Sequence, residues 1–202
     1  MRVVSEMELD NPETVSEGLP YADSWEHISD ELRYLDLLIH LQVLRQRSRH
    51  PANPLEQLKG LVISEEEVTG LLSDSTVESG EENPLSTFVS ESRSLIESLK
   101  RTESRIKARR AASIKKEVYL SLPHLSQLFH LSSIEEKCLV VCLAPELNRK
   151  YKKLYSYLQD DLTRRRPSVD LLLNLLCNTI EEKVVARRVF DPGAPLIKYG
   201  LL

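Results

Sequence analysis

Hydrophobic residues recur every three or four positions along most of this chain, which is the spacing of one face of a helix. The first stripe follows Ser24, a residue type that caps helices by accepting a hydrogen bond from a free backbone amide. Its main positions are Ile28, Leu32, Leu35, Ile39 and Val43. We therefore predict a long helix from Ser24 to about Arg47, ending before His50 and Pro51. Its apolar face needs a packing partner.

A second long helix is predicted from residue 85 to about residue 116. Its apolar face carries Leu85, Phe88, Val89, Leu95, Ile96, Leu99 and Ile106. The stripe is interrupted at Ser92 and at residues 102–103, so the pattern does not favour a regular coiled coil. Its cationic end suits a helix C-terminus, where positive charge is stabilised by the backbone dipoles.

The last third of the chain has the densest apolar pattern and predicts a series of short helices. We expect them around Pro123, after a cap at Ser132 or Ser133 up to about Pro145, over 147–158, after Ser168, and over 180–190. Residues 196–199 are predicted to form a strand. Because that strand has no visible partner, we expect the chain to be part of a longer protein.

Breaks in the pattern predict three regions. Residues 1–23 are acidic and contain helix breakers, so we expect a flexible leader. Residues 24–117 form a helical extension with two long helices, a short helix ending at Leu72, and a mobile loop near 74–84. We expect residues 118–202 to form a second module of short helices that is truncated at its C-terminal end. The predicted fold class is mostly α, with a short β element at that end.

Composition narrows the class of protein. A hydrophobic content of 41% with 29% charged residues is typical of a helical protein with a real core. A net charge of −4 and a pI near 5.8 do not indicate a dedicated nucleic-acid binder. No apolar run long enough for a membrane span and no signal-peptide pattern are present, so we expect a cytoplasmic location without membrane contact.

Charge is distributed unevenly along the chain. Ten acids and two basic residues fall within residues 1–36, whereas eight Lys or Arg and one Glu fall within 100–116. The basic run is either a solvated helix surface or a docking surface for an acidic or phosphate group. Its candidate contact residues are Lys107, Arg109 and Arg110.

A second basic site is Arg164, Arg165 and Arg166, in a turn before the helix that Ser168 caps. In a helix-turn-helix protein, such residues contact phosphates while the second helix reads base edges. That helix here has only two polar residues, Asp170 and Asn174, so burial or protein contact suits it better. Three tyrosines and three lysines over 150–157 suggest base stacking, but two of these tyrosines lie on the apolar stripe.

Catalytic and metal sites have weaker support. Cys138 and Cys142 would share one helix face and lie near two histidines in sequence, but their apolar neighbours favour buried thiols over zinc ligands. Asp160 and Asp161 could act as an acid–base pair, although the nearby arginines favour a salt-bridged turn. We assign no catalytic, cofactor-binding or metal-binding residue.

The order of the short helices and the final strand fits a winged-helix-like plan. The residues that carry a closer resemblance are 128–132, Glu135, 143–146, Tyr151, 154–161, 166–171, and the Phe, Pro, Ala-Pro-Leu spacing of 190–196. Together they resemble the variant winged-helix region that precedes the ATPase module in a group of prokaryotic AAA-type ATPases. The resemblance covers roughly residues 123–202.

This resemblance implies a non-catalytic region that regulates a ring-forming cytoplasmic ATPase or recruits its substrates and partners. Its own ATPase module and protein clients would be its partners, and nucleic acid is a less favoured one. The phosphate-binding pattern Gly-x-x-x-x-Gly-Lys-Ser/Thr is not found in these 202 residues. ATP and magnesium are therefore expected only in a module beyond residue 202. The alternative is a DNA-binding winged-helix transcriptional regulator.

Overall fold

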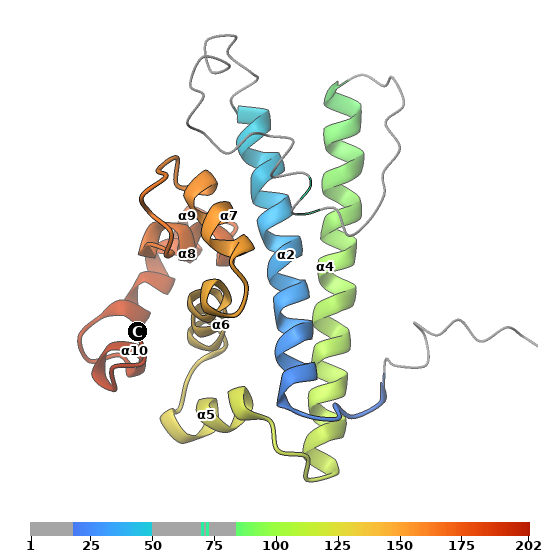
Figure 1. Ribbon diagram of the computed structural model, residues 1–202, viewed down its shortest axis with the longest axis vertical. Coiled ribbons are helices and arrows are strands. Elements are labelled where there is room, and N and C mark those ends of the chain that lie inside the picture. Colours follow the sequence, from blue (N-terminus) through green and yellow to red (C-terminus); the bar gives the residue numbers. More distant parts are fainter. Residues whose placement is uncertain (1–17, 50–69, 71, 73–83) are drawn as a thin grey trace, which may run out of the picture.

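Two long antiparallel helices and a group of short ones make up the structure, a computed structural model that describes residues 18–49, 70, 72 and 84–202 (Figure 1). The long helices are α2 (Ser24–Arg49) and α4 (Pro84–Lys115). The short elements are α5 (Ser121–Phe129), α6 (Ser133–Leu147), α7 (Lys150–Leu158), α8 (Val169–Leu176), α9 (Ile180–Ala186), the 3-10 helix η3 (Arg187–Phe190) and α10 (Pro195–Lys198). Both long helices begin and end within two residues of their predicted bounds.

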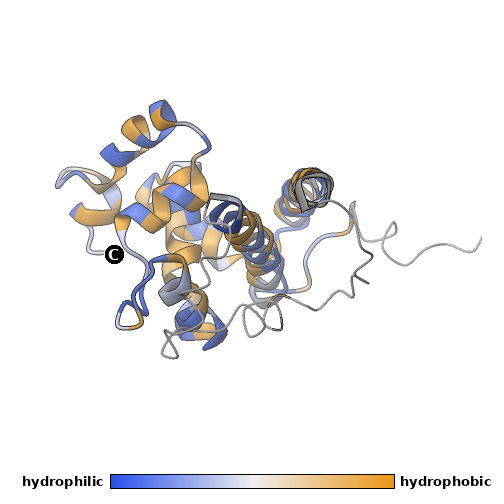
Figure 2. Cartoon of the chain, turned by 90° about the horizontal axis from the view of Figure 1, so that it is seen from above, coloured by the Kyte–Doolittle hydropathy of each residue, from blue (hydrophilic) through white to orange (hydrophobic). Residues whose placement is uncertain are grey.

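Helix α2 lies between α4 and the short helices, and it has an apolar face toward each. Leu41 and Leu44 pack with leucines of α4 in one cluster. A larger core joins α2 to α6, α7, α8 and α10, and its buried members are Leu35, Ile39, Val43, Cys138, Val141, Ala144, Tyr151, Leu154, Tyr155, Leu171, Leu172, Leu175 and Leu196. In Figure 2 the hydrophobic colouring is densest on the short helices beside α2. Helix α2 therefore has packing partners on two sides, α4 on one and the short helices on the other.

Serine caps start two of the short helices as the sequence predicts. At α6, Ser132 forms a capping box with Glu135: its hydroxyl accepts from the Glu135 amide, and the Glu135 carboxylate accepts from the Ser132 amide at 2.8 Å. At α8, the Ser168 hydroxyl accepts from the Leu171 amide at 3.3 Å. These two predictions are confirmed.

The predicted helix stop near Pro145 comes two residues early, because α6 continues through Pro145 to Leu147. A proline has no amide hydrogen, so the carbonyl of Val141 loses its usual helical donor. The buried hydroxyl of Tyr155 replaces it and donates to that carbonyl at 2.7 Å. A contact with α7 thus satisfies the carbonyl group that the proline would otherwise leave unpaired.

The predicted strand over 196–199 is wrong. Pro195 starts α10 instead, and the amides of Ile197 and Lys198 both donate to the Ala194 carbonyl. One helical turn places Leu196 in the main core with no exposed surface, whereas a strand would need a pairing partner. No strand is found in the part of the chain that the structure describes.

Several predictions fall on other parts of the chain. The start of the predicted short helix ending at Leu72 and the predicted loop near 74–84, apart from Pro84, lie outside the described residues. Residues 18–23 belong to the predicted leader, but Tyr21 is buried, and its amide donates to the Ser113 hydroxyl of α4 at 2.8 Å. None of the described helices is both long and apolar enough to cross a membrane.

Candidate functional site

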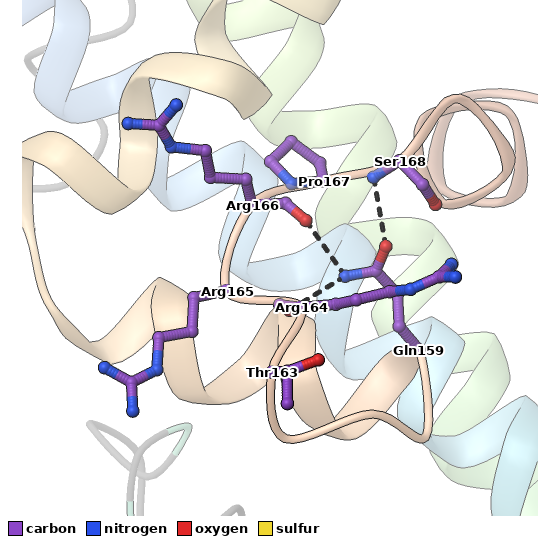
Figure 3. Close-up of a pocket in the computed structure, with 7 residues that line it drawn as sticks. All are labelled: Gln159, Thr163, Arg164, Arg165, Arg166, Pro167 and Ser168. Atoms are coloured by element: carbon purple, nitrogen blue, oxygen red, sulfur yellow. Dashed lines mark hydrogen bonds between the residues drawn. The ribbon is translucent and has the colours of Figure 1, made fainter.

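The Arg-rich turn between α7 and α8 forms an open cavity of about 480 Å³ (Figure 3). Its lining is Gln159, Thr163, Arg164, Arg165, Arg166, Pro167 and Ser168. This lining contains three cationic side chains and no acidic one. We define these residues as the arginine turn.

Gln159 holds the backbone of the arginine turn in place. Its side-chain amide donates to the carbonyls of Arg164 and Arg166, each at 3.1 Å. Its side-chain oxygen accepts from the amide of Ser168 at 3.0 Å (Figure 3). The Ser156 hydroxyl, which is buried on α7, lies 3.2 Å from the same Arg164 carbonyl and donates to it. One polar side chain therefore connects both ends of the turn.

Asp161 stabilises the first half of the arginine turn. One carboxylate oxygen accepts from the amide and the hydroxyl of Thr163, at 2.9 and 2.6 Å. The other oxygen lies 3.1 Å from the Arg164 guanidinium. The Thr163 hydrogen bonds, together with the Arg164 charge, lower the pKa of Asp161. Asp161 therefore stays ionised, and its contacts are those of the salt-bridged turn rather than of an acid–base pair.

Arg165 and Arg166 differ from Arg164 in having no ion pair or hydrogen bond from their side chains within the described chain. Both are exposed, and their side chains extend away from each other and from Gln159 (Figure 3). Their backbones are fixed, but their guanidinium groups are free to bind an external group.

Helix α8, which follows the arginine turn, contributes to the core on both of its sides. Its leucines 171, 172 and 175 lie in the main core, and Leu173 packs with Cys177 and Ala186 in a separate cluster. Asp170 and Asn174 are joined by a hydrogen bond of 2.8 Å, and Asn174 also accepts from Lys183. No row of exposed polar side chains is left along this helix for reading DNA bases.

The second group of predicted contact residues does not form one surface. Lys107 is 73% exposed and lies 3.4 Å from Glu103 on its own helix. Arg109 is only 7% exposed and is enclosed between α4 and α2. Arg110 makes two hydrogen bonds to the Glu136 carboxylate of α6. Of these three candidate side chains, only that of Lys107 remains largely exposed.

Arg109 is the centre of a buried ionic cluster that the apolar and charge patterns of the sequence do not predict by themselves. Its guanidinium donates to Glu26 at 2.5 Å and to Asp30 at 3.2 Å. It also lies over the Tyr21 ring, 4.0 Å from the centroid, and donates to the Leu19 carbonyl at 3.2 Å. We define Tyr21, Glu26, Asp30 and Arg109 as the Arg109 cluster. The acid-rich residues 1–36 and the basic run 100–116 were the available signal, because opposite charges attract across antiparallel helices.

Burial and hydrogen bonding in this region shift the pKa values of Glu26 and Tyr21. A hydrogen bond from the Ala22 amide, together with the one from Arg109, lowers the pKa of Glu26. Desolvation by burial raises the pKa of Tyr21, and the Asp30 carboxylate acts in the same direction. The cluster thus contains carboxylates and a neutral phenol around one cation.

Of the two cysteines that could have suggested a zinc site, Cys138 is buried and Cys142 is partly buried. Burial raises the pKa of Cys138 to about 12 and that of Cys142 to about 11. In the described ranges, no three His, Cys, Asp or Glu side chains are grouped as metal ligands would be.

Comparison with known families identifies the type of domain. The family model described as a winged helix domain, variant, matches residues 10–202. No curated protein and no solved structure gives a significant match to the chain. The matched region spans α2 and α4 as well as the short helices.

Proposed function

The chain belongs to the variant winged helix domain family, and from this premise we propose that it is a non-catalytic region that recruits protein partners and regulates a AAA-type ATPase. Winged helix domains serve either DNA binding or protein interaction. The choice between these uses depends on which surfaces the fold leaves free.

Burial of α8 is the observation that carries the proposal. A helix-turn-helix protein reads DNA by placing its second helix in the major groove, where exposed polar side chains bond to base edges. In this chain the helix after the basic turn has four buried leucines, Leu171, Leu172, Leu173 and Leu175. Displacing α8 from the core so that it could enter the major groove would expose these leucines. A protein-contact role is therefore better supported.

The aromatic residues of α7 support the same choice. Tyr151 is 1% exposed and Tyr155 is fully buried. Stacking on nucleic-acid bases requires an accessible ring face, which neither of these rings has. Neither Tyr151 nor Tyr155 can therefore act as a stacking platform for a single strand beside the basic residues of α7.

The ATPase part of the proposal rests on the resemblance of residues 123–202 to the region preceding such modules. ATP and Mg²⁺ would bind in that module, beyond residue 202, and the whole protein would assemble as a homo-oligomeric ring in the cytoplasm. The 202 residues would then act on the module and on protein clients. Reading the coding sequence past codon 202 tests this part: a phosphate-binding loop is expected, and a stop codon there refutes it.

A DNA titration tests the choice between protein and DNA partners. Fluorescence anisotropy with a labelled duplex should show no tight binding at physiological salt. The opposite result would be tight binding that weakens steeply with salt. If that binding were also lost in Arg164→Ala/Arg165→Ala/Arg166→Ala, the DNA-binding regulator would replace our proposal.

A further inference from the structure

We propose that the arginine turn binds an acidic segment of a protein partner, with separate carboxylates of the segment pairing with Arg165 and Arg166. This inference rests on the proposed function and specifies the chemistry of the partner. It follows from the rigidity of the turn, the state of its arginines, and the charges around it.

Rigidity comes from contacts that do not use the side chains of Arg165 and Arg166. Gln159 and Ser156 hold the carbonyls of Arg164 and Arg166, and Asp161 holds Thr163. A partner that binds therefore does not have to order the backbone of the turn. Such preorganisation lowers the entropic cost of association.

The three arginines of the turn have different structural roles. Arg164 pairs with Asp161 and belongs to the structure of the turn. Arg165 and Arg166 are the arginines of this turn whose guanidinium groups make no ion pair or hydrogen bond in the described part of the molecule. A guanidinium binds a carboxylate through two parallel hydrogen bonds, which makes arginine selective for this group.

The direction of the side chains determines the form of the ligand. In Figure 3, Arg165 and Arg166 point away from each other, so they do not converge on one small anion. Two acidic side chains spaced along an extended segment can reach both groups. A single phosphate or sulfate ion can reach only one of them.

The surrounding charges favour a short acidic segment over a nucleic acid. On α7, the helix before the turn, Lys150 and Lys152 are already paired with Asp36 and Glu146. A duplex carries one negative charge per about 1.7 Å and would need a basic surface that extends beyond Arg165 and Arg166. A short peptide can place its carboxylates on these two arginines alone.

The test uses a fluorescein-labelled peptide of alternating glutamate and serine, with anisotropy measured at low salt on the 202-residue chain. Arg165→Gln/Arg166→Gln should weaken its binding by about tenfold, the sum of two partly exposed charge pairs. The matched control is Arg187→Gln/Arg188→Gln, which removes the same charge from an exposed pair on η3. The control should change the affinity by less than about twofold.

A second variant tests the preorganised backbone. Gln159→Ala keeps every charge but removes the hydrogen bonds to Arg164, Arg166 and Ser168, so it should weaken peptide binding about threefold. Circular dichroism establishes that each variant is folded. Unchanged affinity in folded Gln159→Ala would contradict the role of the rigid turn.

Two other outcomes would overturn the inference. If Arg165→Gln/Arg166→Gln and Arg187→Gln/Arg188→Gln weakened peptide binding equally, only the net charge of the chain would matter. Failure of the wild-type chain to bind the peptide, with no duplex binding either, would remove the acidic partner but leave the proposed function standing. Tight duplex binding would instead refute the proposed function itself.

Discussion

Replacing Arg109 with methionine tests whether the Arg109 cluster holds the two long helices together. Arg109 lies on α4, while Glu26 and Asp30 lie on the first turns of α2. The side chain of Asp30 is 2% exposed, so loss of Arg109 leaves a buried carboxylate with fewer partners. Methionine fills similar space and keeps apolar contact with the Tyr21 ring, so the substitution removes mainly the charge and its hydrogen bonds.

The expected cost follows from the burial of each partner. Removing one member of a buried ion pair costs about 3–5 kcal/mol. Here Asp30 retains Arg33 at 2.9 Å and Arg105 at 3.6 Å, and Glu26 is 41% exposed to water. We therefore expect the lower end, about 3 kcal/mol of the free energy of unfolding. Arg109→Lys keeps the charge but cannot donate to Glu26 and Asp30 from two separate nitrogens. It should lower the free energy of unfolding by about 1–2 kcal/mol.

Urea denaturation followed by far-UV circular dichroism measures these values. Arg101→Met, at an exposed position of the same helix, is the control and should change stability by less than about 0.5 kcal/mol. Double-mutant cycles should give Arg109 a larger coupling to Asp30 than to the more exposed Glu26. A cost below about 1 kcal/mol for Arg109→Met would refute the reasoning, because it would mean that water screens the cluster.

Three further predictions concern the core, acid stability and thiol reactivity. Leu196→Ala should cost about 2–5 kcal/mol in chemical denaturation, whereas Ile197→Ala on the exposed side of α10 should cost about 0.5 kcal/mol; equal costs would contradict the packing of this helix. The lowered pKa of Glu26 means that its contribution is present above its ordinary pKa of 4.5 and is lost as pH falls through the folded value. Thermal melts from pH 7 to pH 3 should therefore show a smaller loss of stability in Glu26→Gln than in the wild type, and parallel curves would refute this role. Because burial raises the pKa values of Cys138 and Cys142, both should react with a disulfide reagent at pH 8 about 100-fold more slowly than in urea; equal rates would show that they are accessible.

The local sequence pattern was sufficient to predict those helices whose apolar spacing and capping residues lie within a few positions of one another. The bounds of α2 and α4 follow from apolar spacing, and the caps at Ser132 and Ser168 follow from the chemistry of one hydroxyl and nearby amides. Family resemblance on the short helices also identified the winged helix type, which the match over residues 10–202 confirms. The link to an ATPase module stays a prediction.

Distant contacts decided the remaining features. The helix passes Pro145 because Tyr155 reaches the carbonyl that the proline leaves open. Residues 196–199 form a helical turn because this places Leu196 in a core built from four other helices, a gain that local strand propensity does not include.

The basic residues show most clearly what sequence and tertiary structure each determined. The sequence by itself determined where positive charge lies, over 100–116 and at residues 164–166, and that α8 is apolar. Only the tertiary structure decided which charges are used internally. Arg109 and Arg110 face carboxylates of α2 and α6, whereas Arg165 and Arg166 extend from a turn fixed by Gln159. The physical reason is that a charge is neutralised by whatever group the fold brings within hydrogen-bond distance, and for Arg109 and Arg110 those groups lie 83 and 26 residues away.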